Sequence, residues 1–485
     1  MPFFLKKGRG RGGGKAPGAT VGNTQRKRRK NDDDEAPRVG RRRKLEENEE
    51  ILSDDEYSGG ESDKHVSEAS DAEYEDTKES NYRQAKDLLD KLLAEGDLGE
   101  SADEEEEEQF VAGKLREHAA SKAGTLQRQI ARGIVIDEEK EISHRSHRFS
   151  PLALAISPCS RYVVSTGKES HVIKYDLQEK KTVGSIKRQK KIAASQQKAH
   201  SGHIFAVAIS PDGKYLATGG VDCIVKIWNF ETLAHVRDLE GHRQPITSLC
   251  FRLRTTQLFS ASRDRTVKLW DLEQMGLVDT MYGHQDAVLD IDALNRERVL
   301  TCGGQDRTIR LWKVDTESQL ILNGLQECVS IDCVAMLNED HFLSGSADGS
   351  LCVWSVFKKK PTCVRKLAHG KREVTAEPHW VVSVAACPFT DLAASGSGEG
   401  QLRLWRIAQD YRSIVLIYEY EMFGFVNDMR FSADGKILAC GVGKEHKFGR
   451  WWIDEDAQNS IVVLALSDGT SEPPRDEPLG READN

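Results

Sequence analysis

Long apolar runs, paired cysteines and nucleotide- or metal-binding motifs are all missing from this chain of 485 residues. The apolar cluster Phe3–Leu5 is far too short for the core of a signal peptide, and no apolar run approaches the length of a membrane span. The ten cysteines contain no Cys-x-x-Cys pair, which favours buried reduced thiols over disulfides or metal ligands. These absences predict a soluble protein of a reducing compartment, without membrane contact.

The formal net charge of -9 is unevenly distributed along the chain. Met1–Lys30 contains ten lysines or arginines and no acid, whereas acids dominate residues 32–108. Such asymmetry suggests nucleic-acid or ribonucleoprotein partners. Two basic clusters separated by ten residues resemble a bipartite nuclear-localisation signal. They consist of Arg26, Lys27, Arg28, Arg29 and Lys30, followed by Arg41, Arg42, Arg43 and Lys44.

The first 135 residues do not have the composition of a compact domain. Residues 1–80 form a basic, then acidic, tail that we expect to be disordered because it is too polar to bury a core. Within 81–135, helical periodicity appears in Asn81–Ala94 and in Phe110–Ile130, beside an acidic linker. Both helices would be amphipathic, and it stays open whether they dock on the rest of this chain or on a partner.

A unit with a period of 42 residues recurs after this extension. Trp228, Trp270, Trp312 and Trp354 follow one another at that spacing, and an aspartate lies six residues before each of them. Within one unit, Ile246–Phe251 alternates apolar and polar residues, as a half-buried strand does. Looser copies extend the series to seven. In them Tyr175, Trp405 and Trp451 take the tryptophan position, and Glu169, Glu399 and Glu445 take the aspartate position.

Gly-His, an aspartate turn and a closing tryptophan at this period resemble the WD-repeat family. The resemblance implies an all-β fold, a seven-bladed β-propeller with one four-stranded blade per repeat. We place the propeller at 136–467, between a largely disordered, partly helical N-terminal extension and a disordered tail at 468–485. Either Gly133–Ile136 or Ser460–Leu466 is expected to supply the outer strand that closes the ring. We favour Ser460–Leu466 as a strand of the last blade, with the N-terminal segment pairing beside the closure.

Histidine, serine and aspartate recur together in the repeats, which raises the alternative of a hydrolase. A catalytic nucleophile and its base must face one cleft, whereas here the set returns in successive blades, each time with a tryptophan. A buried hydrogen-bond chain from the tryptophan through serine or threonine and histidine to aspartate explains this recurrence better. The predicted structural sets are His200, Thr218, Asp222 and Trp228; His242, Ser260, Asp264 and Trp270; His284, Asp306 and Trp312; and Ser344, Asp348 and Trp354.

Several repeats depart from this pattern. Cys302 stands at the serine position of the fourth repeat, and Gln326 stands at the histidine position of the fifth. The first repeat has no Gly-His turn, and His147 is interpreted as at best a remnant of one. The chain also lacks a phosphate-binding glycine-rich loop, a His-Glu-x-x-His helix and a metal-ligand cluster. We therefore expect no enzymatic activity, no catalytic residue, no metal, no cofactor and no small-molecule substrate.

Four stretches narrow the resemblance to one branch of the family, the WD-repeat proteins of the U3 small nucleolar ribonucleoprotein. They are residues 109–117, 124–131, 283–290 and 441–452. The resemblance implies a non-catalytic protein of the nucleus and nucleolus that binds the box B/C region of U3 small nucleolar RNA. It implies as partners the small protein that binds the kink-turn and the other core proteins of that particle. The particle belongs to the small-subunit processome, which processes ribosomal RNA for the small ribosomal subunit.

The residues expected to contact RNA are basic and lie in three places. The Tyr175–Trp228 spacing exceeds the period by 11, and this insertion forms a basic loop suited to phosphate contact. The other two places are the turns that carry arginine and the end of the seventh repeat. The candidates are Lys187, Arg188, Lys190, Lys191, Arg263, Arg265, Arg307, Lys444, His446, Lys447 and Arg450. Ordinary turn chemistry is the alternative for the turn arginines, and a structural role is the alternative for the last four.

The competing function is a nuclear peptide-binding scaffold, either a ubiquitin-ligase substrate receptor or a histone reader. Ligase receptors of this family often carry Trp-Asp-x-Arg. The one Trp-Asp pair in this sequence, Trp270-Asp271, is followed by Leu272 and Glu273, so that box is missing. A histone reader needs an acidic, aromatic-lined mouth, and on this point the sequence leaves the alternative open.

Overall fold

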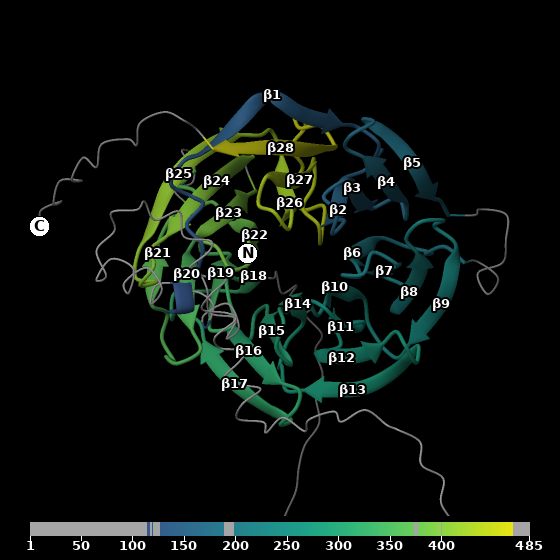
Figure 1. The fold of residues 1–485 in the computed structure, drawn as a ribbon, viewed down its shortest axis with the longest axis horizontal. Helices are drawn as coiled ribbons and strands as arrows, with labels where there is room; N and C mark the ends of the chain where they lie inside the picture. The colour runs from purple at the N-terminus through teal and green to yellow at the C-terminus, as the bar shows by residue number, and fades with distance from the viewer. Residues whose placement is uncertain are drawn as a thin grey trace, which may run out of the picture. The chain divides into compact units, whose positions relative to one another are not determined.

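The computed structural model describes residues 114–116, 119, 127–188, 198–372, 377–398 and 400–468. Within these ranges the chain forms seven four-stranded antiparallel sheets, which are arranged as blades around a ring (Figure 1). The predicted seven-bladed, all-β propeller is therefore confirmed. The nuclear-localisation clusters, the predicted helix Asn81–Ala94 and residues 469–485 of the predicted tail lie outside the described residues. No helix in the described part of the chain is long and apolar enough to cross a membrane.

Each blade runs from an inner strand beside the central channel to an outer strand at the rim. In that order, blade 1 has β2 (Pro151–Ile156), β3 (Tyr162–Gly167), β4 (Val172–Asp176) and β5 (Lys181–Ile186). Blade 2 has β6 (Ile204–Ile209), β7 (Tyr215–Gly220), β8 (Ile224–Asn229) and β9 (His235–Glu240). Blade 3 has β10 (Ile246–Phe251), β11 (Gln257–Ser262), β12 (Thr266–Asp271) and β13 (Gly276–Tyr282). Blade 4 has β14 (Val288–Asp292), β15 (Arg298–Gly303), β16 (Thr308–Lys313) and β17 (Ser318–Asn323).

The remaining three blades follow the same order. Blade 5 has β18 (Ile331–Met336), β19 (His341–Ser346), β20 (Leu351–Ser355) and β21 (Cys363–Arg365). Blade 6 has β22 (Val381–Ala386), β23 (Leu392–Ser397), β24 (Gln401–Ile407) and β25 (Ile414–Glu421). Blade 7 has β26 (Phe425–Phe431), β27 (Ile437–Gly443), β28 (Ser460–Asp468) and β1 (Ile134–His144).

Apolar side chains pack between neighbouring blades, so the core forms a ring rather than a single centre. The second and third strands are buried on both faces; Leu258, Phe259 and Val267 of blade 3, for example, are fully buried. The outer strands are more exposed, and Val236, Arg237 and Glu240 of β9 face solvent. The middle strands are apolar on both faces because they contact the neighbouring blades on both sides, whereas the outer strand faces solvent on one side.

The ring is closed by the N-terminal strand. β1 pairs antiparallel with β28, and Ile134 lies opposite Asp468 at one end of the ladder. Ile134 and Ile136 are buried in the apolar cluster between blades 6 and 7. Ser460–Leu466 is therefore a strand of the last blade, as predicted, and the N-terminal segment pairs beside it. β28 is the third strand, however, and β1 is the outer one.

The segment before β1 is not the helix that periodicity predicts up to Ile130. Residues 114–116 and 119 are helical, but Arg128 forms a parallel bridge to Thr390 of blade 6. The amides of Ile130 and Ala131 donate hydrogen bonds of 2.8 and 3.0 Å to Asp391 Oδ1. The helix prediction is wrong at this end, because these contacts with blade 6 satisfy the backbone and pack Ile130 against the core without a helix.

Each blade exposes its loops on two opposite faces of the ring. Because successive strands are antiparallel, the turns from second to third strand lie on the same face as the links from an outer strand to the next inner strand. We call this the upper face. The turns from first to second strand and from third to fourth strand lie on the lower face.

Closure by β1 predicts a strong difference between adjacent residues of that strand. Ile136→Ala should lower the free energy of unfolding by about 2–5 kcal/mol, because it opens a cavity in the core. Val135→Ala is the matched control, since Val135 is 40% exposed and should change stability by less than about 1 kcal/mol. Urea unfolding of the two variants checks this. Equal effects would mean that β1 does not seal the last blade.

Candidate nucleic-acid interface

The recurring polar side chains form buried hydrogen-bond chains inside the blades. In blade 3, His242 Nδ1 lies 2.9 Å from Asp264 and Nε2 lies 2.7 Å from the Ser260 hydroxyl. Trp270 donates its indole N–H to the same hydroxyl over 2.8 Å. Ser260 is fully buried, so no substrate reaches it. The set therefore fixes the upper-face turn to the middle strands and has no nucleophile exposed to solvent.

Blades 2 and 4 repeat this arrangement, with one correction. In blade 2 the members are His200, Thr218, Asp222 and Trp228. In blade 4 the hydroxyl belongs to Thr301, which lies 2.8 Å from His284 and accepts the Trp312 N–H over 2.9 Å. Cys302 does not take the serine position, because the blade 4 turn has one more residue than its counterpart. Strand register agrees, since Thr301 pairs with Arg310 as Ser260 pairs with Lys268.

Blade 1 also contains a chain of this kind, although its sequence lacks Gly-His. His147 is buried, with Nδ1 2.8 Å from Glu169 and Nε2 2.8 Å from Ser165. The interpretation of His147 as a remnant is therefore wrong. His147 and Glu169 are 22 residues apart, as His242 and Asp264 are. This spacing could have identified His147 from the sequence, although the glycine that usually precedes the histidine is missing.

Blades 5 and 6 keep parts of the chain. In blade 5, Trp354 donates to Ser344 over 2.8 Å, Gln326 is exposed, and Asp348 accepts hydrogen bonds from serines of its own turn instead. In blade 6, His369 Nε2 lies 2.7 Å from Ser395, which also accepts the Trp405 N–H. Burial lowers the pKa of His369 to about 3, so its imidazole is neutral.

The seventh repeat differs most from its prediction. Trp451 does not close a blade, since its side chain is 60% exposed and it lies outside any strand. The third strand is β28, and residues 444–459 form an insertion between β27 and β28 on the upper face. Glu445 does not take the place of the repeat aspartate. It forms ion pairs with Lys168 of blade 1 and with Arg450, both at 2.7 Å. The Glu-to-Trp spacing in this insertion imitates the repeat by coincidence.

All the predicted RNA-contact positions that the structure describes belong to upper-face segments. Lys187 and Arg188 follow β5 and are exposed; Lys190 and Lys191 lie outside the described residues. Arg265 and Arg307 are exposed at turn positions with φ of 69° and 55°. Arg263, Lys444 and Lys447 are half-buried, and the Arg450 side chain is 68% exposed.

His446 is the candidate that does not fit an RNA contact. It is buried, and its ring packs against Trp380, Phe425, Phe448 and Trp451 at centroid distances between 5.2 and 6.4 Å. Burial, followed by the charges of Lys447 and Lys168, lowers its pKa to about 3. A neutral, buried imidazole offers no positive charge to a phosphate. His446 instead anchors the insertion of residues 444–459 to the blades.

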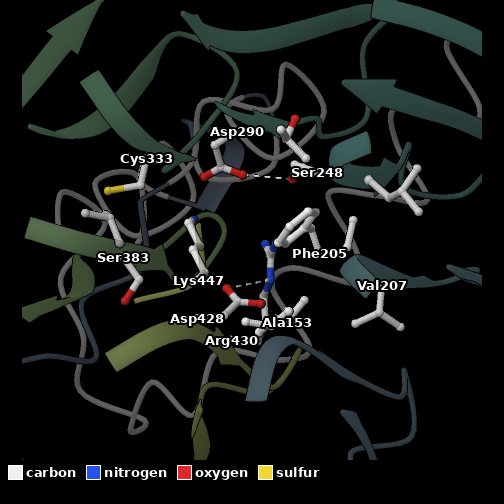
Figure 2. A pocket seen from close by; sticks show the side chains of 15 residues that line it. Ala153, Phe205, Val207, Ser248, Asp290, Cys333, Ser383, Asp428, Arg430 and Lys447 are labelled. Carbon is white, nitrogen blue, oxygen red and sulfur yellow. Dashed lines mark hydrogen bonds and ion pairs between the residues drawn. The ribbon is translucent and has the colours of Figure 1, made fainter. Parts of the chain in front are cut away.

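The central channel offers little room for a ligand. Its pocket holds about 20 Å³, which suits roughly one water molecule. Figure 2 shows Asp290, Asp428, Arg430 and Lys447 around this space, with Asp290 hydrogen-bonded to Ser248 over 2.8 Å. Two carboxylates and two cations balance there. Within the described ranges, no group of three or more acidic, cysteine or histidine side chains is arranged to hold a metal ion.

A larger pocket lies on the upper face, where blade 7 meets blades 1 and 2. It holds about 220 Å³ and is lined by Phe149, Lys168, His203, Phe205, Glu445, Lys447, Phe448, Gly449 and Arg450. Lys447 and Arg450 were predicted from the sequence, whereas the aromatic residues and Lys168 were missed. No spacing relates these residues, because they come from three blades that are distant in the sequence.

The chain also resembles proteins of known family. Residues 194–229, 233–271, 275–313, 322–355 and 362–406 match the family model "WD domain, G-beta repeat". The chain is 44% identical to human U3 small nucleolar RNA-interacting protein 2, over 81% of this chain and 82% of the relative. It is 26% identical to Ribosomal RNA-processing protein 9 of Saccharomyces cerevisiae, over 56% and 59% of the two chains. A solved structure entitled "Structure of U3-55K" superposes with a TM-score of 0.65 at 38% identity and covers 68% of this chain and all of that one.

The buried hydrogen-bond chains predict that the free energy of unfolding depends on pH in the acidic range. Burial alone raises the pKa of Asp306, but hydrogen bonds from His284 and Thr308 lower it from 3.8 to about 2. The Asp306 carboxylate therefore contributes about 2 kcal/mol above pH 4, and this contribution is lost as the pH falls towards 2. Asp306→Asn should lower the free energy of unfolding by that amount at pH 7, and the deficit should shrink in acid.

Asp315→Asn is the matched control, because Asp315 is exposed at the lower-face turn of the same blade. Urea unfolding at several pH values provides the measurement. A deficit for Asp306→Asn that stays constant between pH 7 and pH 2 would contradict a role for the ionised carboxylate.

Proposed function

Because the chain belongs to the family of WD-repeat proteins that includes human U3 small nucleolar RNA-interacting protein 2, we propose that it is a component of the U3 small nucleolar ribonucleoprotein and acts in ribosomal RNA processing. Its role is to hold RNA and protein in place without catalysis. The box B/C region of U3 RNA is the RNA it binds, beside the small protein that holds the kink-turn. It works in the small-subunit processome in the nucleolus.

One observation carries this proposal beyond family membership. The predicted cations that the structure describes come from four separate parts of the sequence, yet the antiparallel topology puts these parts on the upper face. Lys187 and Arg188 lie on the link from blade 1 to blade 2, Arg265 and Arg307 on turns, and Arg450 on the insertion. A face with cations from several blades suits an RNA backbone, whose phosphates are recognised by shape and charge.

The turn arginines support this use of the face. Arg265 and Arg307 adopt left-handed backbone conformations, as do the shorter Ser170 and Cys223 at the equivalent positions of blades 1 and 2, and glycine takes this position in blade 5. A side chain larger than glycine costs roughly 1 kcal/mol in this region. Both arginine side chains are exposed, so they contribute no core packing that would offset this cost. Phosphate contact gives these two positions a reason to carry a long cation.

A non-catalytic role agrees with the state of the polar side chains. The histidine, hydroxyl and carboxylate groups that resemble a hydrolase are enclosed inside the blades and bonded to one another. The basic clusters at Arg26–Lys30 and Arg41–Lys44 would direct the chain to the nucleus. The expected partners are thus U3 RNA and the core proteins around it, rather than a small molecule or a membrane.

Charge reversal on the link between blades 1 and 2 tests the RNA-binding face. Glutamate at Lys187, Arg188, Lys190 and Lys191 should weaken binding of U3 box B/C RNA about tenfold or more and flatten the dependence of affinity on salt, because phosphate contacts are lost. Binding is measured with the full chain, in the presence of the kink-turn protein, across a range of salt concentrations.

The control reverses three charges on the other face. Lys358, Lys359 and Lys360 are exposed on the lower-face turn of blade 5, so glutamate there should leave the salt slope close to that of the natural chain. Equal effects from the two faces would mean that only net charge matters. An unchanged affinity and slope in the first variant would remove the link from the interface.

A further inference from the structure

The 220 Å³ pocket on the upper face has aromatic walls. Phe205 of β6 and Phe448 of the insertion stand 5.6 Å apart between ring centroids. The guanidinium of Arg263 lies over both rings, at 5.9 and 5.0 Å. Phe149, from the link between β1 and β2, completes the lining and is 43% exposed. Aromatic rings beside a solvent-open space offer flat surfaces for stacking.

The floor of the pocket is charged and rigid. Lys168 and Glu445 form a 2.7 Å ion pair in which both side chains are less than a tenth exposed. Lys168 Nζ also donates to the carbonyl of His446 over 3.0 Å, and the second carboxylate oxygen of Glu445 accepts from Arg450. Because both members of the pair have these further partners, they are held at fixed positions. They present polar atoms to a group that enters the pocket beside the aromatic rings.

The rim is positive. Lys447 and Arg450 line the pocket together with Lys168, whereas Glu445 is the only carboxylate among the described lining residues. Arg148 lies next to Phe149, with its guanidinium 5.6 Å from that ring. This positive rim favours a ligand that carries phosphate over an apolar peptide side chain. The volume is below the range of about 300–1,000 Å³ that is usual for whole small-molecule ligands, which suits one flat ring system.

We infer that this pocket receives a single unpaired nucleobase of the bound RNA, stacked against the phenylalanines while the rim cations contact its flanking phosphates. The inference rests on the proposed function and adds to it a site that recognises an exposed base. Single-stranded RNA is commonly held in this way, by aromatic stacking next to a basic surface. The pocket lies beside Arg263, Lys447 and Arg450, so the base and the backbone would be bound by one continuous surface.

The test measures affinity for U3 box B/C RNA, already bound to the kink-turn protein, as a function of salt. Phe149→Ala should weaken binding about fivefold or more, because stacking is lost, and should leave the salt slope unchanged, because no phosphate contact is removed. Phe149→Tyr keeps the ring and should retain the natural affinity. Phe448→Leu keeps an apolar side chain without a π-face and should behave like Phe149→Ala.

The matched control is Phe357→Ala, which removes a phenylalanine that is 77% exposed on the lower face and should change nothing. Thermal unfolding identifies any variant that is not folded. If either Phe149→Ala or Phe448→Leu fails to fold, the RNA affinity of the other one tests the inference. If the natural chain fails to bind the RNA, the proposed function itself fails. If it binds and both phenylalanine variants bind equally well, the base pocket is wrong. If the phenylalanine variants keep their RNA affinity but no longer bind another protein of the particle, the pocket binds a peptide and the inference is overturned.

Discussion

The pairing of β1 with β28 is the constraint on which the rest of the molecule depends. A propeller has no single core, and each blade is buried only because a neighbour stands on both sides. Blade 7 is completed by residues from both ends of the propeller, and buried Ile134 and Ile136 seal it against blade 6. On the upper face, the Lys168–Glu445 ion pair joins blade 1 to the insertion of blade 7. On the lower face, Asp391 holds the segment that leads into β1.

The candidate site is built on this same seam. The insertion of residues 444–459 leaves the last blade, Phe149 follows the closing strand, and Lys168 comes from the first blade. These groups meet only when the ring is closed, so the candidate site depends on closure. The buried histidine chains have a different task. They fix the upper-face turns of the blades, which lets Arg265 and Arg307 project from defined positions.

The fold could be predicted from the sequence because the tryptophan period and the aspartate offset are local and repeat several times. Prediction failed where similar residues occur for another reason. Glu445 and Trp451 imitate the offset but belong to an insertion, and one additional turn residue moved the blade 4 hydroxyl from Cys302 to Thr301. His446 was predicted to contact RNA, although packing against four rings makes it a neutral anchor. The aromatic pocket had no signature, because only the closed ring brings its residues together.

Ultraviolet crosslinking of the tagged full chain in cells, with sequencing of the attached RNA and identification of the crosslinked peptides, is the most direct measurement. An upper face that holds U3 RNA predicts reads concentrated on the box B/C region. It also predicts crosslinked peptides from the link after β5, the arginine turns and residues 444–459. Background RNA alone, or peptides confined to lower-face turns such as Lys358–Lys360, would contradict it. The chain would then be a nuclear propeller that binds its partners through protein contacts.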